Sequence, residues 1–125
     1  MKRRLRVLVA DDHPSVRENL RYLVDAEADL QCIGAAKDGH TCWAMCMELQ
    51  PDVLVVDQDI PGLDGATIAR TINRKLPHIR VILYTMDSDI CSVAQEFGAA
   101  ACISKDAPFD HLLSAIRHSV SALPG

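Results

Sequence analysis

Short apolar segments alternate with amphipathic segments five times along the 125 residues of the chain. The apolar segments have the length of strands and lie at Leu5–Ala10, Leu30–Ala35, Val53–Val56, Arg80–Tyr84 and Ala101–Ser104. The segments that follow them carry apolar residues at helical spacing and cover residues 14–26, 40–49, 66–75, 87–97 and 108–123. Because strands separated by helices run parallel and cross over with right-handed connections, the pattern predicts one doubly wound α/β domain.

Three of the predicted helices carry the clearest signals. Pro14 suits a first helical turn after a cap at Asp12 or His13, and Gly98 suits the C-terminal cap of the segment 87–97. The last helix has an apolar stripe made of Leu112, Leu113, Ile116, Val120 and Leu123.

Composition excludes several classes of protein. The net charge of −4 gives no strong attraction to nucleic acid, so direct nucleic-acid binding by this domain is not expected. The basic residues at positions 2, 3, 4 and 6 are interpreted as solvated charges. No apolar run approaches the roughly 18 residues that span a membrane. A cytoplasmic location without membrane contact is expected.

The cysteines are Cys32, Cys42, Cys46, Cys91 and Cys102. Their odd number and the lack of an export signal argue against a disulfide framework. Cys42 and Cys46 share a helix face and are expected to be small buried side chains, because no standard metal spacing is present. Cys91 is expected to be a free thiol that is open to oxidation if exposed.

Reactive side chains follow four of the predicted strands. Asp11 and Asp12 come after the first, Asp57 after the third, Thr85 after the fourth and Lys105 after the fifth. Ligand sites in open α/β sheets lie at the carboxyl ends of the strands. We therefore expect these groups to meet at one edge of the sheet.

These side chains suit the transfer of a phosphoryl group. Bare carboxylates at positions 11, 12 and 57 would repel one another, and Mg²⁺ offsets this repulsion while leaving room for a substrate phosphate. A carboxylate is also a known covalent nucleophile that forms an aspartyl phosphate. Lys105 and Thr85 would bind phosphoryl oxygens through an ammonium and a hydroxyl.

Four motifs resemble the receiver domain of bacterial two-component response regulators. They are DDHP at 11–14, VLVVDQDIPGLDG at 53–65, VILYT at 81–85 and ISKDAP at 103–108. The resemblance covers essentially the whole chain. It implies a flavodoxin-like (CheY-like) fold with five parallel strands in the order 2-1-3-4-5 and five helices. It also implies phosphotransfer from a sensor histidine kinase.

Carried over residue by residue, the resemblance makes Asp57 the phosphoryl acceptor. Asp12 would bind Mg²⁺ directly, Asp11 mainly through water, and Asp57 and the backbone carbonyl of Asp59 would complete the ligand set. Thr85 and Lys105 would bind the phosphoryl oxygens and report phosphorylation to the rest of the domain.

The DDHP, PGLDG and KDAP variants are similar to the class whose output is a LuxR-type DNA-binding domain. This resemblance implies control of transcription and a homodimer on phosphorylation. Residues 1–125 are interpreted as one receiver, with residues 121–125 as the start of a linker to a C-terminal DNA-binding domain. The candidate surface contacts are Arg17, Arg21, Arg117 and His118, although a solvated polar face is favoured for each.

The chain departs from the family pattern at several positions. Cys102 stands where receivers commonly have the Tyr or Phe that moves with the switch Thr. Met86 replaces a small residue and would narrow access to Asp57. Asp59 and Asp87 occupy positions that tune dephosphorylation in the family.

Three other functions share part of this pattern, and the sequence argues against two of them. A receiver that acts as an interaction module without phosphorylation is the principal alternative, because Met86 and Cys102 depart from the pattern. A haloacid-dehalogenase-type phosphatase would share the DxD of Asp57 and Asp59 but places it on its first strand. A flavodoxin-like FMN carrier needs a phosphate loop that is not acidic. No enzymatic turnover is expected beyond the domain's own phosphotransfer and autodephosphorylation.

Overall fold

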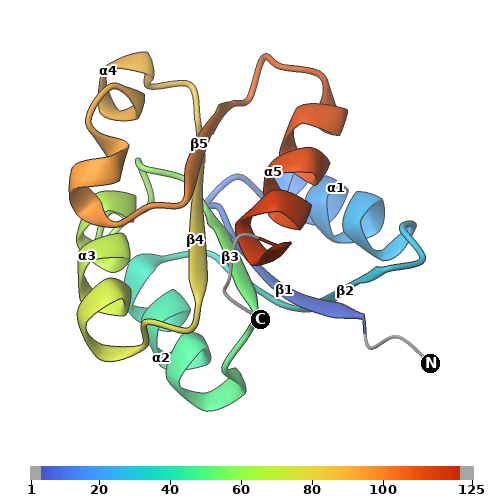
Figure 1. The fold of residues 1–125 in the computed structure, drawn as a ribbon, viewed down its shortest axis with the longest axis horizontal. Coiled ribbons are helices and arrows are strands. Elements are labelled where there is room, and N and C mark those ends of the chain that lie inside the picture. The colour runs from blue at the N-terminus through green and yellow to red at the C-terminus, as the bar shows by residue number, and fades with distance from the viewer. Residues whose placement is uncertain (1–3, 122–125) are drawn as a thin grey trace.

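The computed structural model describes residues 4–121 and contains one parallel sheet of five strands. The strands lie in the order β2-β1-β3-β4-β5, as the sequence predicts (Figure 1). Their bounds are β1 (Leu5–Ala10), β2 (Leu30–Ala36), β3 (Val53–Val56), β4 (Arg80–Thr85) and β5 (Ala101–Ser104).

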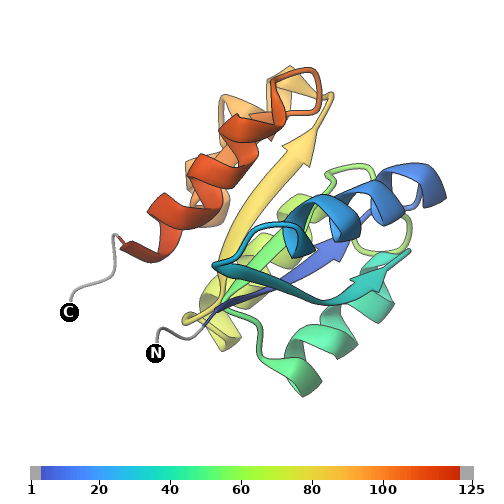
Figure 2. The same ribbon diagram turned by 90° about the vertical axis from the view of Figure 1, so that its right-hand side faces the viewer.

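Helices cover both faces of this sheet, which confirms the doubly wound arrangement. They are α1 (Pro14–Asp25), α2 (Gly39–Leu49), α3 (Gly65–Lys75), α4 (Ser88–Cys91) and α5 (Phe109–Ser121), with a 3₁₀-helix η1 (Ala94–Phe97) after α4. In Figures 1 and 2, α1 and α5 cover one face, and α2, α3 and the α4–η1 segment cover the other.

The central strand β3 explains the uninterrupted apolar run in the sequence. All four of its residues are buried. Leu54 and Val56 pack in the core beneath α2 and α3, whereas Val53 and Val55 pack in the core beneath α1 and α5. A strand buried on both faces has no solvent-facing positions, so its sequence does not alternate.

Helix ends are fixed by local hydrogen bonds. The carboxylate of Asp64 accepts a hydrogen bond from the Thr67 backbone N–H at 2.8 Å and begins α3, and Asp38 does the same for α2 through Thr41. His13 precedes α1 but makes no such side-chain bond. Gly98 has a φ of 81° after η1, which is the left-handed C-terminal cap that the sequence predicts.

The prediction of one continuous helix over 87–97 was wrong. The helix α4 ends at Cys91, and the chain continues through hydrogen bonds three residues apart, including Val93 N–H to the Ile90 carbonyl. The Ser92 hydroxyl donates to the Asp89 carbonyl at 2.7 Å and competes with regular helix bonding at this point.

The expectation of no disulfide was also wrong. Cys91 at the end of α4 is bonded to Cys102 in β5, with 5.3 Å between their Cα atoms. The two thiols meet only because α4 folds back over the neighbouring strand, which a count of cysteines does not reveal. Cys42 and Cys46 are buried and free, as expected, and Cys32 is free and half-buried.

Within residues 4–121, no helix combines the length and the apolar character that crossing a membrane requires. The end of the proposed linker, residues 122–125, and Leu123 of the predicted apolar stripe lie outside the described residues.

Candidate functional site

The carboxyl ends of four strands are tied together by backbone hydrogen bonds. The N–H of Asp57 donates to the Ala10 carbonyl at 3.1 Å, which places the end of β3 beside the end of β1. The N–H of Lys105 donates to the Thr85 carbonyl at 3.1 Å and places the end of β5 beside β4. The strand-end residues singled out in the sequence therefore gather at one edge of the sheet.

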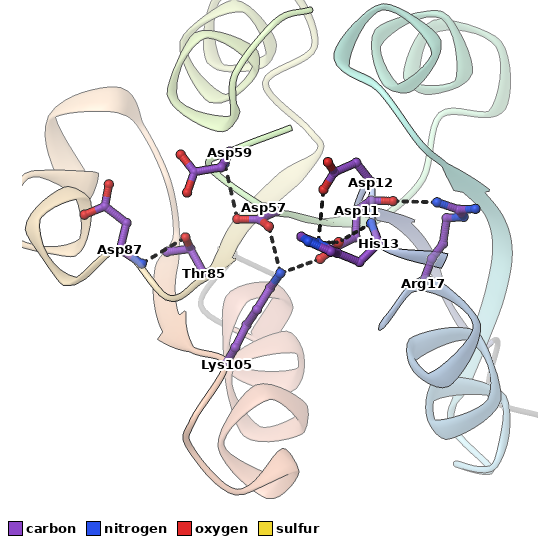
Figure 3. Close-up of polar contacts among 9 residues, drawn as sticks. All are labelled: Asp11, Asp12, His13, Arg17, Asp57, Asp59, Thr85, Asp87 and Lys105. Atoms are coloured by element: carbon purple, nitrogen blue, oxygen red, sulfur yellow. Dashed lines mark hydrogen bonds and ion pairs between the residues drawn. The ribbon is translucent and has the colours of Figure 1, made fainter. Parts of the chain in front are cut away.

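Lys105 connects two of the predicted acids. Its Nζ donates to Oδ2 of Asp11 at 2.6 Å and to Oδ2 of Asp57 at 2.7 Å (Figure 3). The Asp11 side chain is 1% exposed and the Asp57 side chain 6% exposed. Charges this deeply buried require partners, and the ammonium group provides one for both carboxylates.

The same contacts determine the protonation of Lys105. Burial is the largest single influence on the pKa of Lys105 and lowers it, because it disfavours the charged form. The hydrogen bonds and charges of Asp11 and Asp57 outweigh burial and leave the pKa of Lys105 raised. The ammonium is therefore held in its charged form at neutral pH.

Carboxylate oxygens cluster beside this ammonium. One ligand atom from each of Asp11, Asp12, His13 and Asp57 lies within 4.8 Å of all the others. Three carboxylates at such short range offer the hard oxygen ligands that Mg²⁺ prefers. The acidic pocket therefore fits the binding of a divalent cation.

Two residues at the site had no predicted role there. The Nδ1 atom of His13 lies 3.1 Å from carboxylate oxygens of both Asp11 and Asp12. The guanidinium of Arg17 donates to the Asp11 backbone carbonyl at 2.8 Å, so Arg17 supports the loop after β1 as well as lining the surface of α1. The only feature of the sequence that indicates these roles is that His13 and Arg17 lie two and six residues after Asp11.

Thr85 ends β4 and is 1% exposed. Its hydroxyl oxygen accepts a hydrogen bond from the Asp87 backbone N–H at 3.1 Å. The Asp87 carboxylate turns away from Thr85 (Figure 3) and accepts hydrogen bonds from Asp89 and Ile90 as the N-cap of α4. This arrangement connects the hydroxyl at the site to the start of α4.

The remaining predicted residues lie around this centre. The Asp59 N–H donates to Oδ1 of Asp57 at 3.2 Å, and Met86 is 59% exposed. Cys102 in β5 pairs with Leu83 of β4 and is held in the disulfide to Cys91.

The turn after β3 packs tightly against the acceptor strand. Gly65 begins α3, and its N–H donates to the Gln58 carbonyl at 3.1 Å. A Cβ atom at Gly65 would lie 2.9 Å from the Asp57 carbonyl oxygen and 2.9 Å from the Gln58 Cα. The backbone approach therefore requires glycine at this position.

Comparison with known proteins agrees with this geometry. A family model described as the response regulator receiver domain matches residues 7–117. A transcriptional regulatory protein of Bacillus subtilis, YxjL, is 36% identical over 118 residues, which cover 93% of this chain and 54% of that protein. The chain thus spans about half the length of this relative.

Solved structures are similar over nearly the whole chain. The receiver domain of the putative response regulator NarL of Mycobacterium tuberculosis has a TM-score of 0.91 at 27% identity, covering 98% of this chain and 100% of that one. A LuxR-family response regulator of Aurantimonas has a TM-score of 0.88 at 28% identity, covering 94% of this chain and 86% of that one. The chain belongs to the response regulator receiver domains of two-component systems, and its relatives include LuxR-family regulators.

Proposed function

We propose that this domain is a phosphorylation-dependent signalling switch in which Asp57 accepts a phosphoryl group from a sensor histidine kinase. The observation that carries the proposal is the position of Lys105, whose Nζ lies between Asp11 and Asp57 beside a cluster of carboxylates. A buried acceptor, a neighbouring cation and an acidic pocket that includes the acceptor are the parts that phosphoryl transfer to a carboxylate requires.

The transfer starts from the contacts of Asp57, Lys105 and Thr85 that the structure shows. A carboxylate oxygen of Asp57 attacks phosphorus, a P–O bond forms, and the P–N bond to the donor imidazole breaks with its electron pair leaving on nitrogen. Lys105 already contacts Asp57, so its ammonium follows the added charge with a small movement. The Thr85 hydroxyl exchanges its contact with the Asp87 N–H for a phosphoryl oxygen.

The proposed cofactor is Mg²⁺. The residues that would hold it are Asp11, Asp12 and Asp57, together with the backbone carbonyl of Asp59. When bound, the ion would offset the repulsion among the carboxylates and neutralise charge on the incoming phosphoryl group. Met86 and the acids Asp59 and Asp87 would adjust the access of water and so the lifetime of the phosphorylated state.

The proposed output is control of transcription. The names of YxjL and of the Aurantimonas protein, as a transcriptional regulator and a LuxR-family regulator, support it. We infer a cytoplasmic protein in which phosphorylation alters contacts with a DNA-binding domain and favours a homodimer. The domain would catalyse nothing beyond its own phosphotransfer and autodephosphorylation.

The test is the intact mass of the protein after incubation with acetyl phosphate and Mg²⁺. We expect one phosphoryl adduct in the wild type and none in Asp57→Asn or after chelation of the metal. Asp106→Asn is the matched control, because this acid is exposed and lies next to Lys105. If folded wild type gave no adduct, the domain would instead be an interaction module that works without phosphorylation.

A further inference from the structure

We propose that Cys91 and Cys102 form a reversible thiol-oxidation site that fastens the α4–η1 segment to β5. Their Cα atoms are 5.3 Å apart, within the range of about 4.4–6.8 Å over which a disulfide forms without movement of the backbone. Both residues are half-buried, so the pair lies within reach of small redox reagents.

Both ends of this cross-link connect to Thr85. On one side, Cys91 ends α4, and the N-cap of α4, Asp87, donates its N–H to the Thr85 hydroxyl at 3.1 Å. On the other side, Cys102 lies three residues before Lys105, which donates its N–H to the Thr85 carbonyl at 3.1 Å. The disulfide therefore closes a ring of covalent and hydrogen bonds that passes through Thr85.

The segment from α4 to η1 has little regular structure of its own. It contains a four-residue α4, a turn at 92–93 and the 3₁₀-helix η1. Ala94 is the one residue of α4 and η1 that is buried. Short 3₁₀ segments with few buried side chains open readily, so a covalent tether has a large effect on their motion.

The chemistry is thiol–disulfide exchange with a small-molecule disulfide such as oxidised glutathione. One protein thiolate attacks the glutathione disulfide and releases one reduced glutathione, and the second protein thiolate then displaces the other. The two protein thiols lose two electrons and two protons, and one molecule of oxidised glutathione gains them and becomes two molecules of reduced glutathione. In the proposed cytoplasmic location such a bond is transient, because glutathione and thioredoxin reverse it.

The other cysteines are poorly suited to this reaction. Burial raises the pKa of Cys32, and its sulfur donates to the Gly34 carbonyl at 3.3 Å. The hydrogen bond to Cys46, together with burial, raises the pKa of Cys42. A raised pKa leaves little reactive thiolate on Cys32 and Cys42 at neutral pH. Neither forms a disulfide in the structure, whereas Cys91 and Cys102 are joined.

The consequence for signalling rests on the proposed function. If Thr85 turns toward a phosphoryl group on Asp57, it leaves its contact with Asp87 and frees the start of α4. The cross-link holds the other end of α4 on β5 and resists that movement. Oxidation would therefore uncouple phosphorylation from the α4 surface, with Cys102 taking a regulatory role.

The first experiment counts free thiols and maps disulfide-linked peptides in glutathione buffers. We expect the wild type to lose the thiols of Cys91 and Cys102 in oxidised glutathione and to regain them in excess reduced glutathione. Cys32→Ser, the matched control, behaves in the same way, whereas Cys91→Ser and Cys102→Ser form no intramolecular bond. The proposal would be overturned if no disulfide formed in oxidised glutathione, if the disulfide joined other cysteines, or if it persisted in excess reduced glutathione.

The second experiment measures backbone hydrogen exchange over residues 87–99 without phosphorylation. We expect exchange about tenfold faster in the reduced than in the oxidised wild type. Cys91→Ser exchanges like the reduced protein under both conditions. Equal exchange rates in the oxidised and reduced wild type would refute the tether.

A third measurement separates this proposal from the proposed function. Acetyl phosphate and Mg²⁺ are added to both redox forms, and hydrogen exchange over residues 87–99 is compared with that of Asp57→Asn. We expect phosphorylation to change exchange in the reduced form only. Equal changes in hydrogen exchange in both redox forms would contradict the uncoupling. The lack of a phosphoryl adduct in both forms would contradict the proposed function, and the tether would then be tested by the first two experiments alone.

Discussion

At the scale of single residues, the site is organised by the charge of Lys105. Its ammonium contacts two buried carboxylates that directly follow β1 and β3, while its own backbone follows β5. Loss of this charge would leave two acids buried without a partner, and that is more costly than the loss of one surface ion pair. The side chain is 14% exposed, so solvent screens the interaction only in part.

We expect Lys105→Met to lower the free energy of unfolding at pH 7 by about 1–3 kcal/mol. Because the folded protein raises the pKa of Lys105 above its ordinary value of 10.5, this stabilisation is complete below that pH and is lost as the pH rises through the folded-state pKa. The difference between wild type and variant should therefore shrink above pH 10.5.

Urea denaturation at pH 7, 9 and 11 measures this difference. Lys75→Met serves as the control, because Lys75 is an exposed lysine at the end of α3, and it should change stability by less than about 0.5 kcal/mol. Equal free energies of unfolding for Lys105→Met and wild type at pH 7 would show that the ammonium of Lys105 does not stabilise the buried carboxylates.

At the scale of elements, the turn between β3 and α3 positions the acceptor. Gly65 touches the backbone of Asp57 and Gln58, and the Gln58 side chain accepts a hydrogen bond from the Ala66 N–H at 2.8 Å. The helix α3 is therefore fastened directly to the residues that end β3. A change of backbone here moves the reactive carboxylate as well as the helix.

Gly65→Ala tests this close approach. The new methyl group would meet backbone atoms at 2.9 Å, and these atoms cannot turn aside as a flexible side chain does. We expect a loss of about 2–3 kcal/mol in thermal or urea unfolding and slower formation of the phosphoryl adduct.

Gly34→Ala is the matched control, because the atom nearest to its added Cβ would be the terminal methyl carbon of the Met45 side chain, at 2.6 Å. That flexible end is able to move, so the loss should be smaller than at Gly65. If Gly34→Ala lost more stability than Gly65→Ala, the backbone next to Gly65 would not be rigid.

At the scale of the whole molecule, Arg117 joins α5 to the turn that leads into β2. Its guanidinium donates two hydrogen bonds to Asp29, each 2.8 Å long, and one to Glu27 at 2.9 Å. These partners lie 88 and 90 residues away in the chain. The contact links the last helix to an edge strand of the sheet.

We expect Arg117→Met to lower the free energy of unfolding by about 0.5–1 kcal/mol, because the three side chains are between 35% and 53% exposed and solvent screens them. The hydrogen bond from Arg117 lowers the pKa of Asp29 below 3.8. The stabilisation is therefore present above pH 3.8 and is lost as the pH falls through the folded-state pKa of Asp29.

Urea denaturation at pH 7 and below pH 3.8, at low salt and at about 1 M salt, tests this contact. The difference from wild type should be largest at pH 7 and low salt. Arg21→Met removes a weaker pair with Glu18 inside α1, at 3.8 Å, and should have a smaller effect. A difference that does not depend on pH or salt would point to lost packing instead of lost charge.

The sequence by itself determined the order of the elements and which strand-end residues meet at the candidate site. Strand and helix periods depend on residues a few positions apart, so Val53–Val56 and the stripe of α5 are readable without coordinates. Because parallel strands end at the same edge, Asp11, Asp57, Thr85 and Lys105 could be grouped before their distances were known.

Only the tertiary structure decided which groups touch. The contacts of Lys105 join residues 48 and 94 positions apart, and the Cys91–Cys102 bond depends on how α4 lies over β5. The break of the predicted fourth helix, by contrast, follows from a local hydrogen bond of the Ser92 hydroxyl that the spacing of apolar residues does not reveal. Periodicity specifies which face of an element is buried, whereas contacts between distant residues depend on the packing of several elements at once.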